Sequence, residues 1–87
     1  MKQSAAELKK RNNRRDGMLS MENKEWMTKM ICYLRTRSVE EKRLEDIRQD
    51  ITDMLLEAQD RGESANQVLG GNYQQFCDEI VDSLGEP

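Results

Sequence analysis

The chain has 87 residues, of which 14 are basic, 17 are acidic and none is histidine. This length allows one small domain, and a net charge of −3 argues against disorder, which requires low hydrophobicity together with high net charge. The lack of histidine removes the commonest general base and the usual nitrogen ligand of zinc, and no apolar run approaches the length of a membrane span. No secretory signal follows the N-terminus, so we expect a cytoplasmic protein without a membrane partner.

Helix-capping signals predict the secondary structure, because nothing alternates with the period of a strand. A capping box has Ser or Thr followed three residues later by Glu or Gln, and Ser4, Ser38 and Ser64 each begin one. Ser20 and Asn72 are simpler caps. The predicted helices span residues 5–15, 21–36, 39–61, 65–69 and 73–84.

The first segment, residues 1–16, is a basic N-terminal helical arm. It carries six basic and two acidic side chains, and only Ala5 and Leu8 are apolar on its helical face. We expect the arm to dock weakly on the rest of the chain or to pack on a partner. Five of its cations could contact phosphates, although no aromatic residue is interleaved with them as in single-strand binders. They are Lys9, Lys10, Arg11, Arg14 and Arg15.

Three of the later helices carry a continuous apolar face. The apolar side chains of residues 21–36 cover an arc of about 160°, whereas those of residues 39–61 cover about 100°. The last helix also gathers its apolar residues on one face, and three such faces can bury one another. We therefore predict an all-α fold, a small helical bundle of three main helices plus a short helix, built by a single domain over residues 17–87.

A row of carboxylates, here called the acidic ridge, lies opposite the apolar face of the predicted helix 39–61. It consists of Asp46, Asp50, Asp53, Glu57 and Asp60. Like charges at this spacing repel, so the ridge is either a solvated face or a docking strip for a basic partner, such as the arm of a second copy. A di-metal centre is disfavoured because it needs inward Glu and His ligands. Leu56 lies about 100° from the apolar face and is either a single exposed residue or part of a homodimer interface.

The two cysteines lie far apart in the sequence, without the further ligands that a metal site needs. Cys77 falls in the apolar face of the last helix, which predicts a buried, reduced thiol. Cys32 falls on the polar side of its helix, where Lys29 would favour the thiolate, so Cys32 is a candidate reactive thiol. No Gly-rich phosphate loop or nucleophile elbow is present, and we expect neither a cofactor nor enzymatic activity.

Several segments share a pattern with a known family. An acidic helix that includes residues 46–51 ends in Glu-Ala-x-x-x-Gly-x-Ser at residues 57–64, a short helix ends in Gly at residues 68–70, and a further helix begins near the Phe-Cys pair of residues 76–80. This pattern resembles a family of small bacterial all-helical proteins related to the α-helical signalling domains associated with PadR-type transcription regulators. The resemblance implies an all-helical, non-catalytic regulatory or adaptor protein.

These observations lead to three hypotheses. The first is a non-enzymatic helical interaction or regulatory module that acts through a protein partner, either a PadR-type transcription regulator or a second copy of itself. The second is a small nucleic-acid-associated protein that binds through the basic arm. The third is a thiol sensor that uses Cys32. The residues expected to bind a partner are the five cations of the arm, Leu56, and four residues of the acidic ridge: Asp46, Asp50, Asp53 and Glu57.

Overall fold

The structure, a computed structural model, describes residues 4–83, and these residues form helices without any strand. The all-α prediction is therefore confirmed. Residue 84, which the sequence places in the last helix, lies outside the described residues. The helices are α1 (Ala5–Asp16), α2 (Met21–Thr36), α3 (Glu41–Arg61), α4 (Ala65–Leu69) and α5 (Tyr73–Ser83).

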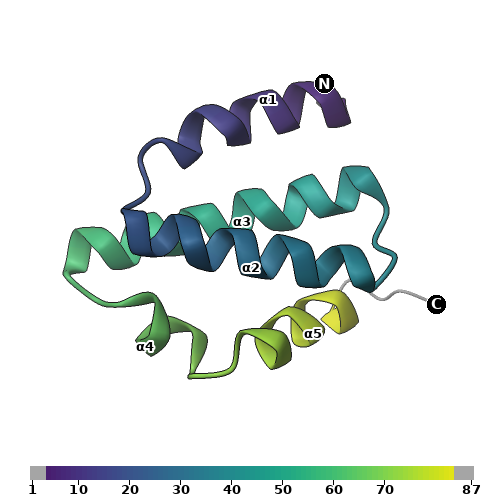
Figure 1. Ribbon diagram of the computed structural model, residues 1–87. Helices are drawn as coiled ribbons and strands as arrows, with labels where there is room; N and C mark the ends of the chain where they lie inside the picture. Colours follow the sequence, from purple (N-terminus) through teal and green to yellow (C-terminus); the bar gives the residue numbers. More distant parts are fainter. Residues whose placement is uncertain (1–3, 84–87) are drawn as a thin grey trace.

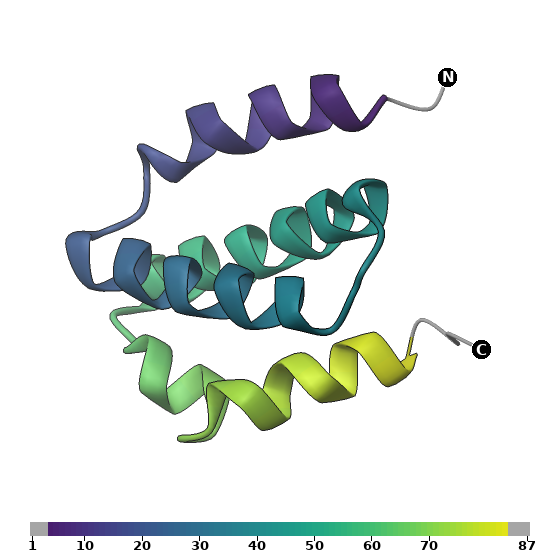
Figure 2. The same cartoon turned by 45° about the vertical axis from the view of Figure 1, so that its right-hand side comes forward.

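The long helices α2 and α3 lie side by side in the middle of the molecule and run in opposite directions (Figure 1). Helix α1 covers one side of this pair and packs chiefly on α3. Helices α4 and α5 cover the other side, and α5 packs chiefly on α2. The turned view gives the same order, with α1 and α5 on opposite sides of the central pair (Figure 2).

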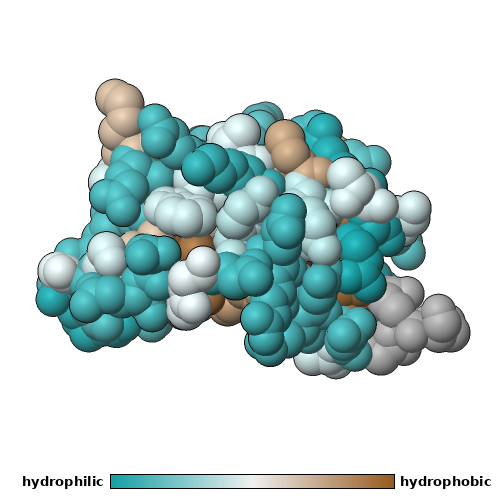
Figure 3. Space-filling model, turned by 60° about the horizontal axis from the view of Figure 1, so that its bottom comes forward, coloured by the Kyte–Doolittle hydropathy of each residue, from teal (hydrophilic) through white to brown (hydrophobic). Residues whose placement is uncertain are grey.

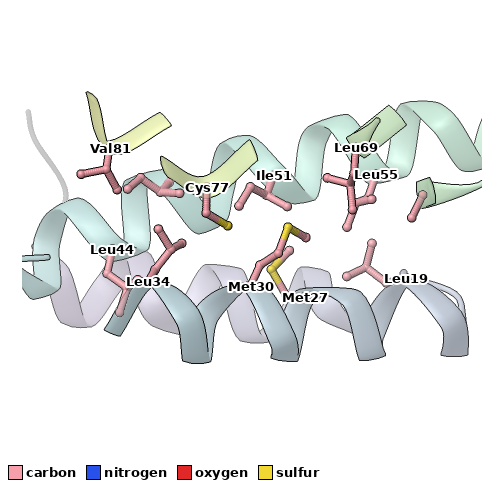
Figure 4. Packing of buried hydrophobic residues seen from close by; sticks show 12 residues of the cluster. Leu19, Met27, Met30, Leu34, Leu44, Ile51, Leu55, Leu69, Cys77 and Val81 are labelled. Atoms are coloured by element: carbon pink, nitrogen blue, oxygen red, sulfur yellow. The ribbon is translucent and has the colours of Figure 1, made fainter. Parts of the chain in front are cut away.

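The hydrophobic core lies between α2, α3 and the C-terminal helices (Figure 4). Met30 and Leu34 of α2 and Leu55 of α3 are fully buried there, and α5 adds Cys77, which is also 0% exposed. Met27 contributes a flexible thioether that fills irregular space between the helices. The other buried members of this cluster are Leu19, Leu44, Ile47, Ile51, Ala65, Leu69 and Val81.

Most of the predicted caps are present. The Ser4 hydroxyl accepts a hydrogen bond from the Glu7 amide at 3.2 Å, and Ser20 and Asn72 cap α2 and α5 in the same way. Ser64 forms a complete capping box with Gln67, in which each side chain accepts a hydrogen bond from the other residue's backbone amide. These bonds satisfy amide groups that have no partner within the helix.

The cap predicted at Ser38 is wrong. Helix α3 begins at Glu41, and its N-cap residue is Glu40, whose side chain makes no capping hydrogen bond. Ser38 has instead a left-handed backbone, with φ of 57°, and its amide donates to the Arg35 carbonyl at 3.3 Å. The residue thus terminates α2, in a position that glycine usually takes, and is not available to start α3.

Candidate functional site

Helix α1 is held on α3 by a buried polar contact. The Asn12 side-chain amide donates to the backbone carbonyl and to the carboxylate of Glu45, both at 3.0 Å. Asn12 is 0% exposed and Glu45 is 3% exposed, and Leu8 is buried beside them at 1%. The expectation of a weakly docked arm therefore needs correction, because it counted apolar residues only and Asn12 is as deeply buried as Leu8. The division of the chain into an arm and a domain over residues 17–87 stays a prediction.

Arg48 of α3 adds further polar contacts to the end of α1. Its guanidinium pairs with the Asp16 carboxylate, donates to Asn13 at 2.7 Å and lies 3.3 Å from the Glu45 carboxylate. Two polar side chains near the end of α1, Asn13 and Asp16, are therefore fixed to one arginine of α3. Because hydrogen bonds to charged groups are the stronger ones, this cluster favours a fixed position of α1 on α3.

The connection between α1 and α2 is fixed to α3 as well. The Gln59 side chain accepts hydrogen bonds from the Ser20 amide and the Asn23 side chain, each at 2.7 Å, and donates to the Met18 carbonyl at 3.2 Å. The end of α1, the start of α2 and the C-terminal half of α3 thus meet at Gln59. This arrangement sets how far α1 stands from α2.

Because α1 packs chiefly on α3 rather than on α2, a groove of about 490 Å³ lies between α1 and α2. We call it the α1–α2 groove. Figures 1 and 2 show α1 above the α2–α3 pair, joined to α2 at one end of the molecule. The residues that line the groove are Lys9, Asn13 and Asp16 of α1, Lys24, Met27, Thr28, Ile31, Cys32 and Arg35 of α2, and Arg48 of α3.

The groove combines an apolar floor with positive charge. Met27 is 4% exposed and Ile31 is half-buried, whereas Lys9, Lys24 and Arg35 are exposed. None of these three cations forms an ion pair with a described residue. The one carboxylate in the lining, Asp16, is already paired with Arg48. The groove can therefore attract an anion and bury apolar surface at the same time.

The five cations of the predicted arm point in different directions. Lys9 lines the groove and Arg15 pairs with Asp53 of the acidic ridge. Lys10, Arg11 and Arg14 are exposed to solvent. The structure therefore brings together only part of the predicted basic run.

The acidic ridge lies on the surface of α3, and part of its charge is neutralised by the same chain. Asp46 pairs with Lys42 at 3.0 Å, and Asp53 pairs with Arg15. The pKa of Asp50 is raised by partial burial and by the like charges of Asp53 and Asp46. One pair between the ridge and the arm, Arg15 with Asp53, therefore forms within one chain, and pairing of their other charges between two copies stays a prediction.

Two further residues of the predicted interface are Leu56 and Glu57, and only Glu57 is exposed as expected. Leu56 is half-buried and packs against the core, so it does not stand beside the ridge as an exposed apolar contact. Glu57 is exposed. A homodimer stays a prediction, but Leu56 does not supply the exposed apolar contact that was expected for it.

The two cysteines have opposite environments. Both are free, Cys32 is exposed in the wall of the groove, and Cys77 is 0% exposed in the core. Burial, with a smaller contribution from the charge of Asp78, raises the pKa of Cys77 to about 11. The buried thiol predicted at Cys77 is thus present. Sequence reasoning did not predict that Cys32 would face a groove. The signal available was the recurrence of Lys24, Thr28, Ile31 and Arg35 at helical spacing on that side of α2.

A polar cluster that the sequence analysis missed joins the end of α2 to α5. The Tyr33 hydroxyl donates to the Asp78 carboxylate at 2.7 Å, and Arg37 pairs with the same carboxylate. The hydrogen bond to Asp78 raises the pKa of Tyr33. The Tyr73 ring lies edge-on to the rings of Trp26 and Tyr33, with centroids 6.0 and 6.3 Å away. These contacts fasten α5 and are structural.

Within residues 4–83 no group of three or more Cys, Asp or Glu side chains is arranged to hold a metal ion. None of the described helices is both long and apolar enough to cross a lipid bilayer. The face that carries α4 and α5 is mostly hydrophilic, with only small hydrophobic areas between the polar side chains (Figure 3). The α1–α2 groove is therefore the best candidate site.

Comparison of the chain with protein-family models, with curated proteins and with solved structures finds no match.

Proposed function

We propose that this protein is a non-enzymatic helical interaction module that acts through a protein partner, and that the α1–α2 groove is its binding site. The observation that carries the proposal is the combination, in one groove, of buried apolar residues and three exposed cations without described ion-pair partners. Surfaces that bind proteins commonly combine an apolar centre with a polar rim.

The lining of the groove supports a binding role over a catalytic one. Catalysis by proton transfer needs a base that is free to accept a proton, and the carboxylate of Asp16 is engaged by Arg48. The Cys32 thiol lacks a base that would activate it as a nucleophile, because the sequence contains no histidine and the lining contains no free carboxylate. The partner suggested by the resemblance is a PadR-type transcription regulator.

The experiment is affinity capture from the native cell with three forms of the chain. In the groove variant, Lys24→Glu and Arg35→Glu reverse two charges in the lining. In the matched control, Lys10→Glu and Arg14→Glu reverse two charges on the exposed side of α1. We expect the wild-type chain and the control to retain the same protein, identified by mass spectrometry, and the groove variant to lose it. Equal capture by all three forms would contradict the proposal.

The second candidate, binding of nucleic acid, is favoured by one observation. Lys10, Arg11 and Arg14 stay exposed after α1 has docked. Fluorescence anisotropy with a labelled duplex tests it, because contacts to phosphates make affinity fall steeply with salt. In this case the Lys10→Glu and Arg14→Glu variant should lose binding, and the groove variant should lose less.

A further inference from the structure

We infer that the α1–α2 groove receives an acidic amphipathic helix of a different protein. Apolar side chains of that helix would lie on Met27 and Ile31, and its carboxylates would pair with Lys9, Lys24 and Arg35. The inference rests on the proposed function and specifies the chemistry of the partner.

The dimensions of the groove fit one face of a helix. On α2 the lining extends from Lys24 to Arg35, which at 1.5 Å per residue is about 16 Å, or three helical turns. A helix placed in such a groove presents apolar anchors at positions i, i+3 or i+4 and i+7. The floor of Met27 and Ile31 lies between the charged ends of this stretch, so anchors in the centre and carboxylates at both ends match it.

Exposed methionines extend the apolar surface beyond the groove. Met18 is 65% exposed and Met21 is 78% exposed, and among the described residues these are the exposed large apolar side chains. Met21 precedes Lys24 and Thr28 by three and seven residues, which places all three on the same side of α2. Methionine adapts its shape to a partner, and a purely ionic ligand such as a phosphate backbone would make no use of this apolar surface.

The charge of the groove selects an acidic partner. Elsewhere in the molecule Arg15, Arg37 and Lys42 have carboxylate partners on the same chain. In the groove, Lys9 and Lys24 have no described ion pair. Complementary charge accelerates encounter and disfavours basic partners, because like charges that meet in an interface cost several kcal/mol.

A second copy of this chain fits the groove less well. Its acidic ridge offers carboxylates, but Met54 and Leu56 on the same helix are half-buried against its own core. The exposed large apolar residues of the described chain, Met18 and Met21, lie in the connection between α1 and α2 and at the first residue of α2. The acidic helices of the described chain, α3 and α5, turn their apolar side chains toward their own core, and we therefore assign the groove to a different protein.

Cys32 provides the readout, because it lines the groove and the other thiol is buried. The probe is a synthetic helical peptide of 18 residues with Leu at i, i+4 and i+7 and Glu at the flanking positions. One control peptide has the same composition with the Leu residues distributed around the helix, and another has Lys in place of Glu. The measurement is the rate at which iodoacetamide alkylates Cys32 in the full chain, followed by intact mass.

We expect saturating acidic peptide to slow alkylation of Cys32 about tenfold, because a bound helix covers the thiol, while both control peptides change the rate less than about twofold. The Lys24→Glu and Arg35→Glu variant should weaken binding of the acidic peptide at least about tenfold, and the Lys10→Glu and Arg14→Glu control less than about twofold. Circular dichroism checks that both variants keep their helices.

Three results would overturn the inference. If the chain alone protects Cys32 as its concentration rises, the occupant is a second copy. If the peptide with distributed Leu residues protects equally well, the groove binds charge without an amphipathic helix. If the acidic peptide does not bind while the capture experiment still finds a protein that the groove variant loses, the proposed function stands and only the chemistry assigned to the partner is wrong.

Discussion

Asn12 determines where α1 lies. Its side-chain amide donates to the backbone carbonyl and to one carboxylate oxygen of Glu45. Its side-chain oxygen has no hydrogen-bond partner among the described residues. Buried polar groups stabilise a structure only when they are paired, and they are costly when one partner is removed. Asn12 therefore serves as a specific polar attachment of α1 to Glu45.

Removal of the Asn12 amide should lower the free energy of unfolding. Asn12→Ala leaves the Glu45 carbonyl and carboxylate with fewer partners in a buried place, which should cost about 2–3 kcal/mol. Urea unfolding followed by circular dichroism measures the change. The matched control, Asn66→Ala, makes the same chemical change at an exposed position and should cost less than about 0.5 kcal/mol. Equal midpoints for the two variants would show that the contact with Glu45 is dispensable.

The two cysteines should differ strongly in reactivity. Iodoacetamide should modify the exposed Cys32 in the folded protein. Cys77 is fully buried and its pKa is raised to about 11, so it should react at least about 100-fold more slowly than Cys32. Intact mass would then show one adduct in buffer and two in urea. Two adducts forming at similar rates in buffer would mean that α5 opens readily.

Asp50 should make stability depend on pH. Its pKa is raised in the folded state, so folding disfavours the ionised form, and the carboxylate destabilises the protein at any pH above that pKa. This penalty disappears as the pH falls below the unfolded value of about 3.9, where the carboxyl is protonated in both states. Asp50→Asn should therefore raise stability by a few tenths of a kcal/mol at pH 7 and by nothing near pH 2.5. Thermal unfolding at both pH values, in wild type and variant, measures the difference. A gain of equal size at both values would exclude charge as its cause.

At the scale of elements, the junction between α2 and α3 is strained. Ser38 occupies a left-handed conformation that L residues with a Cβ adopt at a cost, and α3 starts without a side-chain cap. The end of α3 has the opposite character. Gly62 adopts a similar conformation, with φ of 74°, where glycine is unstrained.

A pair of substitutions tests this contrast. Ser38→Gly should raise the free energy of unfolding by about 0.5–1 kcal/mol, because relief of strain exceeds the greater freedom of glycine in the unfolded chain. Gly62→Ala should lower it by about 1 kcal/mol, although nothing lies within 4 Å of the added methyl group. Differential scanning calorimetry reports both changes. A lower melting temperature for Ser38→Gly would mean that the serine side chain has a stabilising role.

Helix α1 should be separable from the rest of the fold at a cost in stability. The core cluster contains no residue of α1, so a chain of residues 17–87 should still melt cooperatively. It should be less stable by about 3 kcal/mol, because the burial of Leu8 and the bonds of Asn12 are lost. Urea unfolding of the two chains measures the difference. Loss of the cooperative transition would show that α1 belongs to the same folding unit.

At the scale of the whole molecule, the local features were predictable and the placement of α1 was not. Caps and apolar periodicity give the helices to within two residues, because both signals are local in sequence. The contact between Asn12 and Glu45 joins residues 33 positions apart, and no periodicity marks an asparagine as buried. The same limit applies to the groove. Its lining comes from three helices, and Lys9 of α1 could be assigned to it only once the side of α1 that meets α3 was known.

The attachment of α1 by mainly polar contacts has a thermodynamic consequence. If the predicted division holds, the molecule contains two units of unequal stability: the core of α2, α3, α4 and α5, and α1, which contributes no residue to that core. Such units open independently, the weaker one more often. A ligand in the groove touches Lys9 of α1 and Arg35 of α2, so it binds only when the weaker unit is closed. Part of its binding free energy therefore suppresses that opening, and any change that loosens α1 lowers affinity for the ligand without altering a single contact to it.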